Sequence, residues 1–351
     1  MDERMQLRRT CFKAGLTTNE TAQEKRRREA LAVQRARRSN ALDSIRGIED
    51  LVGLFLTGDG SDCESEGKYD DAEENQEGSY NQTPASPRKT DQVSSGSSLS
   101  RPNKYRRFRD RCMRAEFLDL SEGLPADFEN DWIMVGPIPK GKRCLALTFN
   151  EQKRATFGGS ISTLLLSRKH ADQIGEFRTN LPPNCIVDCI YDRANHTLWI
   201  LDILKWKDQA MVDCEASFRF WWRDAKMSEL TPQPLPSSTT LLCSSIGAWN
   251  TFSKAQVCEI ADKMCTSYSA TTQVITRSEN NTSSQARLSI SYECDGLLFY
   301  LKSATYESGE SVLAGWVPLQ APQENCNQHG IAKLKWLCES GQDKNDDQMQ
   351  C

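Results

Sequence analysis

The sequence lacks the motifs of the common metal and enzyme sites. Its 14 cysteines include no CxxC pair and it has only three histidines, so the ligand spacing of a structural zinc site is missing. It contains no Walker loop, no GxGxxG and no GxSxG, which leaves no motif evidence for an NTPase, a dinucleotide-binding enzyme or a serine hydrolase. We therefore expect no metal and no cofactor.

Long apolar runs are absent as well. No run approaches the roughly 18–20 apolar residues that a membrane span requires. Asp2 and Glu3 follow Met1, unlike the start of a signal peptide, and Cys351 is the last residue, so no CaaX box is present. Cysteines scattered through a chain without such a leader are expected to be reduced thiols. These features predict a protein of the cytosol or nucleus with no membrane partner.

Hydrophobic residues make up only 38% of the chain, and the formal net charge of −4 hides an uneven distribution of charge. Residues 1–18 show no pattern and are predicted to be disordered. Residues 57–105 hold a block of Asp and Glu and a Ser-, Thr- and Pro-rich stretch, with too little apolar material to offset the entropy of ordering. We predict a disordered linker there, a folded domain over residues 106–325 and a flexible tail over residues 326–351.

Residues 19–56 are predicted to form a long basic helix. Thr21 and Glu24 fit a capping box, a thin apolar stripe follows, and no proline interrupts the segment. Such a charge run is typical of a solvated face or of a nonspecific RNA-binding arm. A helix enclosed by an acidic solenoid would instead carry cations around most of its circumference. That arrangement is found here, with Lys25, Arg26, Arg27, Arg28, Arg35, Arg37 and Arg38.

The part of the chain after the linker alternates between strand and helix patterns. Helices are predicted over residues 214–228, where Phe218, Trp221 and Trp222 share one face, and over residues 251–265. Residues 192–195 indicate the turn of a hairpin. Branched and aromatic residues predict strands over residues 132–135, 143–149, 185–191, 197–205, 295–300 and 312–317.

Two features of the folded part suggest a ligand. Most tryptophans are expected in the core, but Trp316 follows Gly315, which lets another group approach the backbone closely, and lies near a strand end. A ring so placed can stack on a nucleotide base, which is worth about 1–3 kcal/mol. Residues 140–143 form a turn with three cations, which is either a solvated turn or a contact for phosphate.

Several blocks of residues resemble the snurportin family. They are residues 188–191, 201–206, 218–222 and 295–300, followed by Gly315 and Trp316, in the same order and at similar spacing. The resemblance covers roughly residues 113–320, and residues 21–50 resemble the importin-β-binding segment of the family. It implies a nuclear import adaptor that binds the trimethylguanosine cap of spliceosomal U snRNA and links the snRNP to importin β. It also implies shuttling between cytoplasm and nucleus, with an exportin as a recycling partner.

The implied fold is α+β, with two mostly antiparallel β-sheets and flanking helices, preceded by the basic helix and the disordered linker. It is related to the nucleotide-binding domain of mRNA guanylyltransferases, in which a lysine of a K-x-D-G motif takes the nucleotide covalently. Here Glu293 and Cys294 precede Asp295 and Gly296, so that lysine is missing. The resemblance therefore implies a cap binder and not an enzyme.

The resemblance also implies roles for particular residues of the cap-binding site. Trp316 would be the stacking ring and Ile190 an apolar wall of the base pocket. Lys142 and Arg143 lie where the Lys-Arg pair of the family contributes to cap binding. Residues 113–117 match the pocket-lining Leu-Ser-Glu-Trp of the family loosely, which assigns Met113 and Phe117 to the pocket.

Two positions depart from the family pattern. A phosphate-contacting lysine of the family falls near Gly158, where Lys153 and Arg154 are the nearby cations. The first residues of the chain lack the apolar pattern that contacts the exportin in the family.

Two other functions remain open from the residues alone. A diverged nucleotidyltransferase would form a covalent adduct with a nucleotide. A general RNA-binding factor would bind uncapped RNA as well as capped RNA, mainly through the basic residues between 101 and 114.

Overall fold

The structure is a computed structural model, and it describes residues 21–45, 105–149, 161–278, 281–320 and 330–340. Met1–Ser39 and Asn103–Cys351 make up one compact unit, and Asn40–Pro102 makes up the other. The N-terminus predicted to be disordered lies outside the described residues, as do residues 46–56 and nearly all of the predicted linker.

The basic helix is confirmed as α2 (Ala22–Ile45). Its first turn forms the predicted capping box, because the Glu24 amide donates to Thr21 Oγ1 at 3.1 Å and the Thr21 amide donates to Glu24 Oε2 at 2.9 Å. The helix carries no continuous apolar face, so packing of apolar side chains alone does not account for its position.

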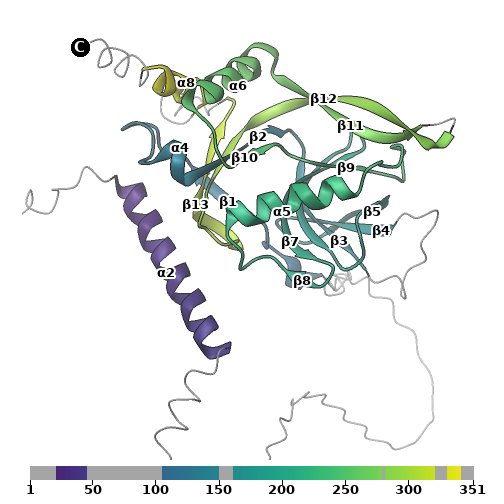
Figure 1. Ribbon diagram of the computed structural model, residues 1–351, viewed down its shortest axis with the longest axis horizontal. Helices are drawn as coiled ribbons and strands as arrows, with labels where there is room; N and C mark the ends of the chain where they lie inside the picture. Colours follow the sequence, from purple (N-terminus) through teal and green to yellow (C-terminus); the bar gives the residue numbers. More distant parts are fainter. Residues whose placement is uncertain (1–20, 46–104, 150–160, 279–280, 321–329, 341–351) are drawn as a thin grey trace, which may run out of the picture. The chain divides into compact units, whose positions relative to one another are not determined.

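The first sheet, in its described part, runs β1-β13-β12-β2-β10, with β11 paired to the far half of β12 (Figure 1). Its pairs are antiparallel except for β1 and β13, which run parallel. The strands are β1 (Met113–Phe117), β2 (Trp132–Pro139), β10 (Ala248–Trp249), β11 (Ser269–Ser278), β12 (Asn281–Leu301) and β13 (Gly309–Pro318).

The second sheet runs β5-β4-β3-β6-β7-β8, and β9 adds to β7 in parallel. The predicted hairpin is confirmed, since β6 and β7 pair antiparallel around residues 192–197. The strands are β3 (Lys142–Thr148), β4 (Ile161–Ser167), β5 (Gln173–Thr179), β6 (Ile186–Asp192), β7 (Thr197–Trp206), β8 (Gln209–Ala210) and β9 (Leu242–Ser245). The fold class is therefore as predicted: two mostly antiparallel sheets with flanking helices.

Short and long helices flank the sheets. They are the 3₁₀ turn η1 (Arg106–Phe108), α4 (Phe128–Asp131), α5 (Ala216–Glu229), α6 (Lys254–Ser267) and α8 (Ile331–Ser340). In Figure 1, α5 lies across β7 and β9, and α6 and α8 lie side by side at the other end of the domain. Among the described residues, no helix combines the length and the apolar character needed to cross a bilayer.

Helix α5 buries the face that its apolar pattern does not indicate. Phe218 and Trp221 are 42% and 57% exposed, whereas Arg219 and Arg223 are fully buried. Arg219 forms an ion pair with Asp202 of β7 at 3.0 Å, and Arg223 donates to the carbonyl oxygens of Leu201 and Ile246, both at 2.6 Å. Buried guanidinium groups therefore attach α5 to the sheet, since each finds a carboxylate or carbonyl partner.

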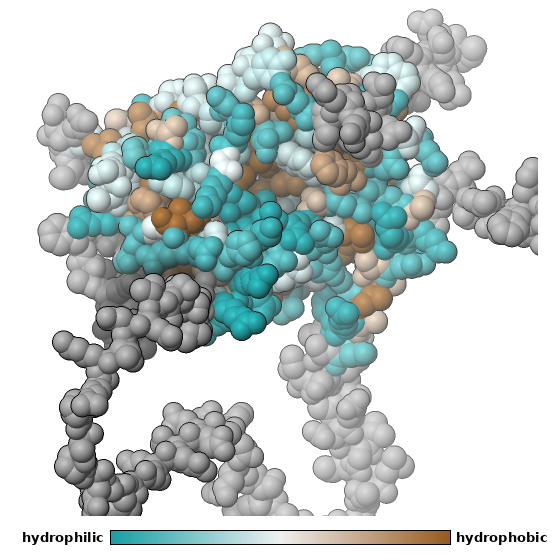
Figure 2. All heavy atoms as spheres, turned by 180° about the vertical axis from the view of Figure 1, so that it is seen from behind, coloured by the Kyte–Doolittle hydropathy of each residue, from teal (hydrophilic) through white to brown (hydrophobic). Residues whose placement is uncertain are grey.

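Most of the buried side chains of the core belong to strands. Two large groups of buried side chains fill the space around β2, β12 and β13 and around β3, β6 and β7. The face shown in Figure 2 is mainly hydrophilic, and its hydrophobic side chains lie in small scattered groups.

The prediction of a flexible tail after residue 325 is wrong for residues 331–340. They form α8, whose Ile331, Leu334 and Cys338 are buried at a spacing of three and four residues. Lys335 forms an ion pair with Asp262 of α6 at 2.5 Å. The tail sequence is polar on average, but three of the apolar residues of α8 fall on one helical face and pack on the core.

This packing predicts different outcomes for two neighbouring substitutions in α8. Leu334→Ala removes a fully buried side chain and should lower the free energy of unfolding by about 2–4 kcal/mol. Trp336→Ala removes a ring that is 55% exposed and should change it by less than about 1 kcal/mol. Urea unfolding followed by circular dichroism measures both, and equally small effects would show that α8 does not stabilise the domain.

Candidate nucleotide-binding site

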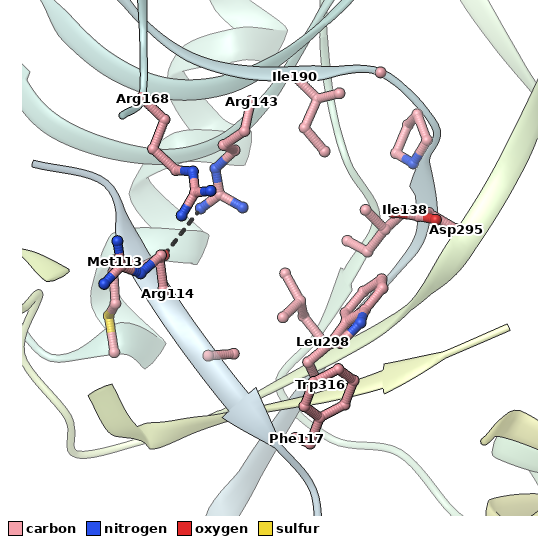
Figure 3. Close-up of a pocket in the computed structure, with 13 residues that line it drawn as sticks. Met113, Arg114, Phe117, Ile138, Arg143, Arg168, Ile190, Asp295, Leu298 and Trp316 are labelled. Atoms are coloured by element: carbon pink, nitrogen blue, oxygen red, sulfur yellow. Dashed lines mark hydrogen bonds between the residues drawn. The ribbon is translucent and has the colours of Figure 1, made fainter. Parts of the chain in front are cut away.

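A cavity of about 390 Å³ opens where strands of the two sheets meet (Figure 3). This volume suits a small organic ligand. The lining residues come from β1, β2, β3, β6, β12 and β13 and from the turns after β2 and β4. They are Met113, Arg114, Ala115, Phe117, Ile138, Pro139, Gly141, Arg143, Arg168, Ile190, Asp295, Leu298 and Trp316.

One end of the cavity is aromatic. The parallel register of β1 and β13 places Phe117 opposite Trp316, and Figure 3 shows the two rings next to each other. A Cβ atom on Gly296 of the adjacent strand would lie 2.6 Å from Cη2 of Trp316. The absence of a side chain at position 296 therefore leaves the space that the indole ring of Trp316 occupies. Gly315 makes room for the side chain of Leu118, not for a ligand, because a Cβ there would lie 2.9 Å from Leu118 Cδ1.

An aliphatic wall continues from the rings. Ile138, Ile190 and Leu298 are each no more than 5% exposed, so they present a fixed apolar surface. The turn at Gly141 packs directly on this wall, since a Cβ on Gly141 would lie 2.7 Å from Ile190 Cγ2. Asp295, an exposed acid, lies at the rim on the same side.

The opposite end of the cavity is cationic. Figure 3 shows the guanidinium groups of Arg143 and Arg168 close together, away from the rings of Phe117 and Trp316. Arg143 pairs with Asp188, and Arg114 pairs with Asp110 at 2.5 Å. Among the described residues, no carboxylate pairs with Arg168. Its charge is therefore available to an anionic ligand.

A buried network holds Arg143 and the strand β1 in place. Asp188 is fully buried and accepts two hydrogen bonds from Arg143, from Nε at 2.5 Å and from Nη2 at 2.8 Å. The hydroxyl of Tyr306 donates to Asp188 at 2.6 Å and accepts from the amide of Met113 at 2.8 Å. Arg143 Nη2 also donates to the carbonyl oxygen of Met113 at 3.3 Å. Both backbone groups of Met113 are thus bound to one network.

The charges in this network are fixed by burial and by each other. Burial favours the neutral form of Arg143, but the Asp188 carboxylate outweighs this and holds the pKa of Arg143 well above its usual value. Burial raises the pKa of Tyr306, and the Asp188 carboxylate raises it further. The hydroxyl therefore stays protonated and donates to Asp188 at neutral pH.

The structure brings five of the six residues predicted for the cap-binding site to one cavity. Trp316, Phe117, Met113, Ile190 and Arg143 line it, whereas Lys142 is exposed and is not among the lining residues. Two of the five also stabilise the fold, since the Met113 side chain is only 1% exposed and Arg143 forms an ion pair with Asp188. The alternative phosphate contacts near residue 158 lie outside the described residues.

Sequence reasoning missed Arg168, Ile138, Leu298 and Asp295 as cavity residues. Arg168 directly follows β4, a strand that was not predicted, and only the pairing of β4 with β3 brings it next to Arg143. Asp295 and Leu298 belong to the predicted strand over residues 295–300. The pairing of β12 with β13 places Leu298 directly opposite Trp316, and no local pattern contains this register.

The seven cations predicted to contact importin β are distributed around α2. Lys25, Arg26, Arg28, Arg35 and Arg37 are exposed. Arg27 is only 4% exposed, and Arg38 forms an ion pair with Glu215 at 3.0 Å. The helix thus exposes most of these cations, while Arg26, Arg27 and Arg38 contact acidic residues of the folded domain.

Comparison with known proteins gives one family and a distant likeness to solved structures. The family model described as Snurportin1, m3G cap-binding domain, matches residues 112–318, which is more than half of the chain. The ligase domain from M. tuberculosis LigD is similar with a TM-score of 0.34 and 9% identity, over 62% of this chain and 61% of that chain. A structure from a study of Lig E DNA ligases has a TM-score of 0.33 and 13% identity, over 60% and 68%. Likenesses this small carry no argument about activity.

The buried network predicts a large loss of stability for Asp188→Asn. This change leaves the guanidinium of Arg143 without its counter-ion in a buried site, which should cost about 3–5 kcal/mol of unfolding free energy. Glu310→Gln is the matched control, because its carboxylate is 86% exposed and pairs with Arg114 at the surface, where such pairs are worth under about 1 kcal/mol. Chemical denaturation of the two variants compares them directly. Similar stabilities would mean that the network does not hold the cavity wall.

Proposed function

The chain belongs to the snurportin family through its m3G cap-binding domain. From this premise we propose that it is a nuclear import adaptor, which binds the trimethylguanosine cap of a U snRNA in the cavity and links the particle to importin β through α2. It would then move between cytoplasm and nucleus.

The observation that carries the cap assignment is the division of the cavity into an aromatic, aliphatic end and a cationic end. N7-methylation makes the guanine cationic, which strengthens its stacking on an indole such as Trp316. The two methyl groups on N2 remove the hydrogen-bond donors of that nitrogen. Ile138, Ile190 and Leu298 supply apolar surface at this end, where a methylated amine loses no hydrogen bond on burial.

The cationic end suits the triphosphate bridge of a cap. Arg168 and Arg143 line the cavity on the side opposite the rings (Figure 3). In a nucleotide the phosphates likewise lie at the end of the molecule that is away from the base. Arg143 is already bound to Asp188, so Arg168 is the residue that we assign to phosphate.

The cavity favours binding over catalysis. Covalent nucleotidyl transfer in the related enzymes needs a lysine nucleophile, and no lysine is among the described residues that line this cavity. Lys140, the cation of the neighbouring turn, pairs with Glu293 at 3.1 Å. A nucleotidyltransferase would also form an adduct with GTP or ATP that survives denaturation, and we expect none.

Removal of the stacking ring tests the base assignment. Trp316→Ala should weaken binding of a trimethylguanosine cap dinucleotide by about 5- to 150-fold, the equivalent of about 1–3 kcal/mol of stacking. Trp336→Ala removes an indole far along the chain in α8 and should leave the affinity unchanged. Isothermal titration calorimetry with trimethyl, monomethyl and unmethylated dinucleotides gives the affinities. Equal affinity of the unsubstituted protein for all three would contradict cap selectivity.

Two cations near the cavity should differ in their effect on salt dependence. Arg168→Ala should weaken cap binding and lower the slope of log affinity against log salt by about one unit, since one phosphate contact is lost. Lys142→Ala should change the slope little, because that side chain does not line the cavity. Titrations at four salt concentrations measure both slopes. The reverse order would assign phosphate to Lys142, in the turn over residues 140–143.

A further inference from the structure

The folded domain carries a docking surface for α2, and residues of one helical face occupy it. Gln23 is 7% exposed, and its side chain both donates and accepts a hydrogen bond at the end of β1. Its Nε2 donates to the carbonyl oxygen of Phe117 at 2.9 Å, and its Oε1 accepts from the amide of Asp119 at 3.1 Å. The start of the helix is thereby bound to the backbone at the end of β1 and two residues beyond it.

Two further side chains continue this face along the helix. Arg27 Nε donates to the carbonyl oxygen of Val312 at 3.2 Å, and its guanidinium carbon lies 4.9 Å from the centre of the Trp132 ring. Gln34 is 5% exposed and accepts from the amide of Thr305 at 2.9 Å. Positions 23, 27 and 34 are four and seven residues apart, which places them on one side of α2.

Acidic residues of the folded domain complement the helix. Glu116 pairs with Arg26 at 3.0 Å and lies 3.5 Å from Arg27, and Glu215 pairs with Arg38 at 3.0 Å. Three of the seven cations predicted for importin β are therefore engaged within the chain.

This interface is polar and incompletely satisfied. Gln34 Nε2 is buried without a hydrogen-bond partner in the described part of the chain, and the ion pair of Arg27 Nη2 with Glu116 Oε1, at 3.5 Å, does not form a hydrogen bond. Burial lowers the pKa of Arg27 to about 10, although Glu116 opposes this shift. The described apolar side chains of α2 that pack on the core are the partly buried Ala30 and Leu31. An interface with incompletely hydrogen-bonded buried polar atoms and little apolar contact is suited to release.

We propose that docking of α2 on the folded domain is autoinhibitory. Importin β can enclose α2 only after the helix has left the folded domain. The proposal rests on the importin-β link proposed above. A partner that surrounds a helix needs the face that carries Arg27, and docking covers that face. The two states exclude each other, so the apparent affinity for importin β equals the affinity for the released helix multiplied by the fraction of molecules that are released.

Full-length variants test the exclusion. Gln23→Ala with Gln34→Ala removes two docking side chains and keeps all seven predicted importin-β cations. Val33→Ala changes a 48% exposed position of the same helix and is the control. The double variant should bind importin β on the order of tenfold more tightly than the unsubstituted chain, and Val33→Ala should not, since loss of docking raises the released fraction. Unchanged cap affinity of the double variant shows that the domain is folded.

Amide hydrogen exchange gives a second readout. The amides of Asp119 and Thr305 donate to Gln23 and Gln34, so they report docking residue by residue. Importin β should speed their exchange in the unsubstituted protein. Binding of importin β with both amides still protected, or equal affinity of all the variants, would overturn the docking proposal alone. No binding of importin β by any variant would overturn the proposed importin-β link, and the docking proposal with it.

Discussion

The site depends on the ion pair between the partly buried Arg143 and the fully buried Asp188. Arg143 belongs to β3 and Asp188 to β6 of one sheet, whereas Met113, which the network binds at both its amide and its carbonyl, belongs to β1 of the other. Burying two charges is costly, and it is tolerated here because the carboxylate accepts three hydrogen bonds from Arg143 and Tyr306. The pair thereby fixes the distance between the two sheets at the point where the cavity opens.

Because the network fixes the start of β1, different residues of this strand contact different parts of the protein. Met113 at its start is held by the network, Phe117 at its end faces the cavity beside Trp316, and Glu116 between them faces α2. One short strand thus contributes to the proposed cap site on one side and to the docking of the basic helix on the other. Its parallel pairing with β13, irregular between Ala115 and Glu116, turns successive side chains to these different partners.

Much of the fold could be predicted from local patterns, and the exceptions have physical causes. The strands around Ile190 and Leu201 are mostly apolar and branched, and their prediction is confirmed. The strand predicted over residues 295–300 is confirmed as the last part of β12, whose mostly polar first half was not predicted. Strands β1 and β5 were missed because their charged and polar residues resemble loops until a neighbouring strand pairs with them. Strand β4 was also missed, although Leu164, Leu165 and Leu166 make its centre apolar. Helix α5 was predicted, but its apolar stripe faces outward because two arginines find buried acceptors inward. Arg168 and the docking of α2 arise from contacts between distant segments, which periodicity does not report.

The central claim is that a cationic guanine without N2 donors lies between the indole of Trp316 and an aliphatic wall. Nuclear Overhauser effects between a trimethylguanosine dinucleotide and methyl-labelled protein test it most directly. We predict cross-peaks from the N2-methyl protons of the cap to the methyl groups of Ile138, Ile190 or Leu298, together with upfield shifts of the base protons caused by the indole ring. Saturated binding with no such cross-peaks, or with N2-methyl contacts only to residues outside the cavity, would contradict the account.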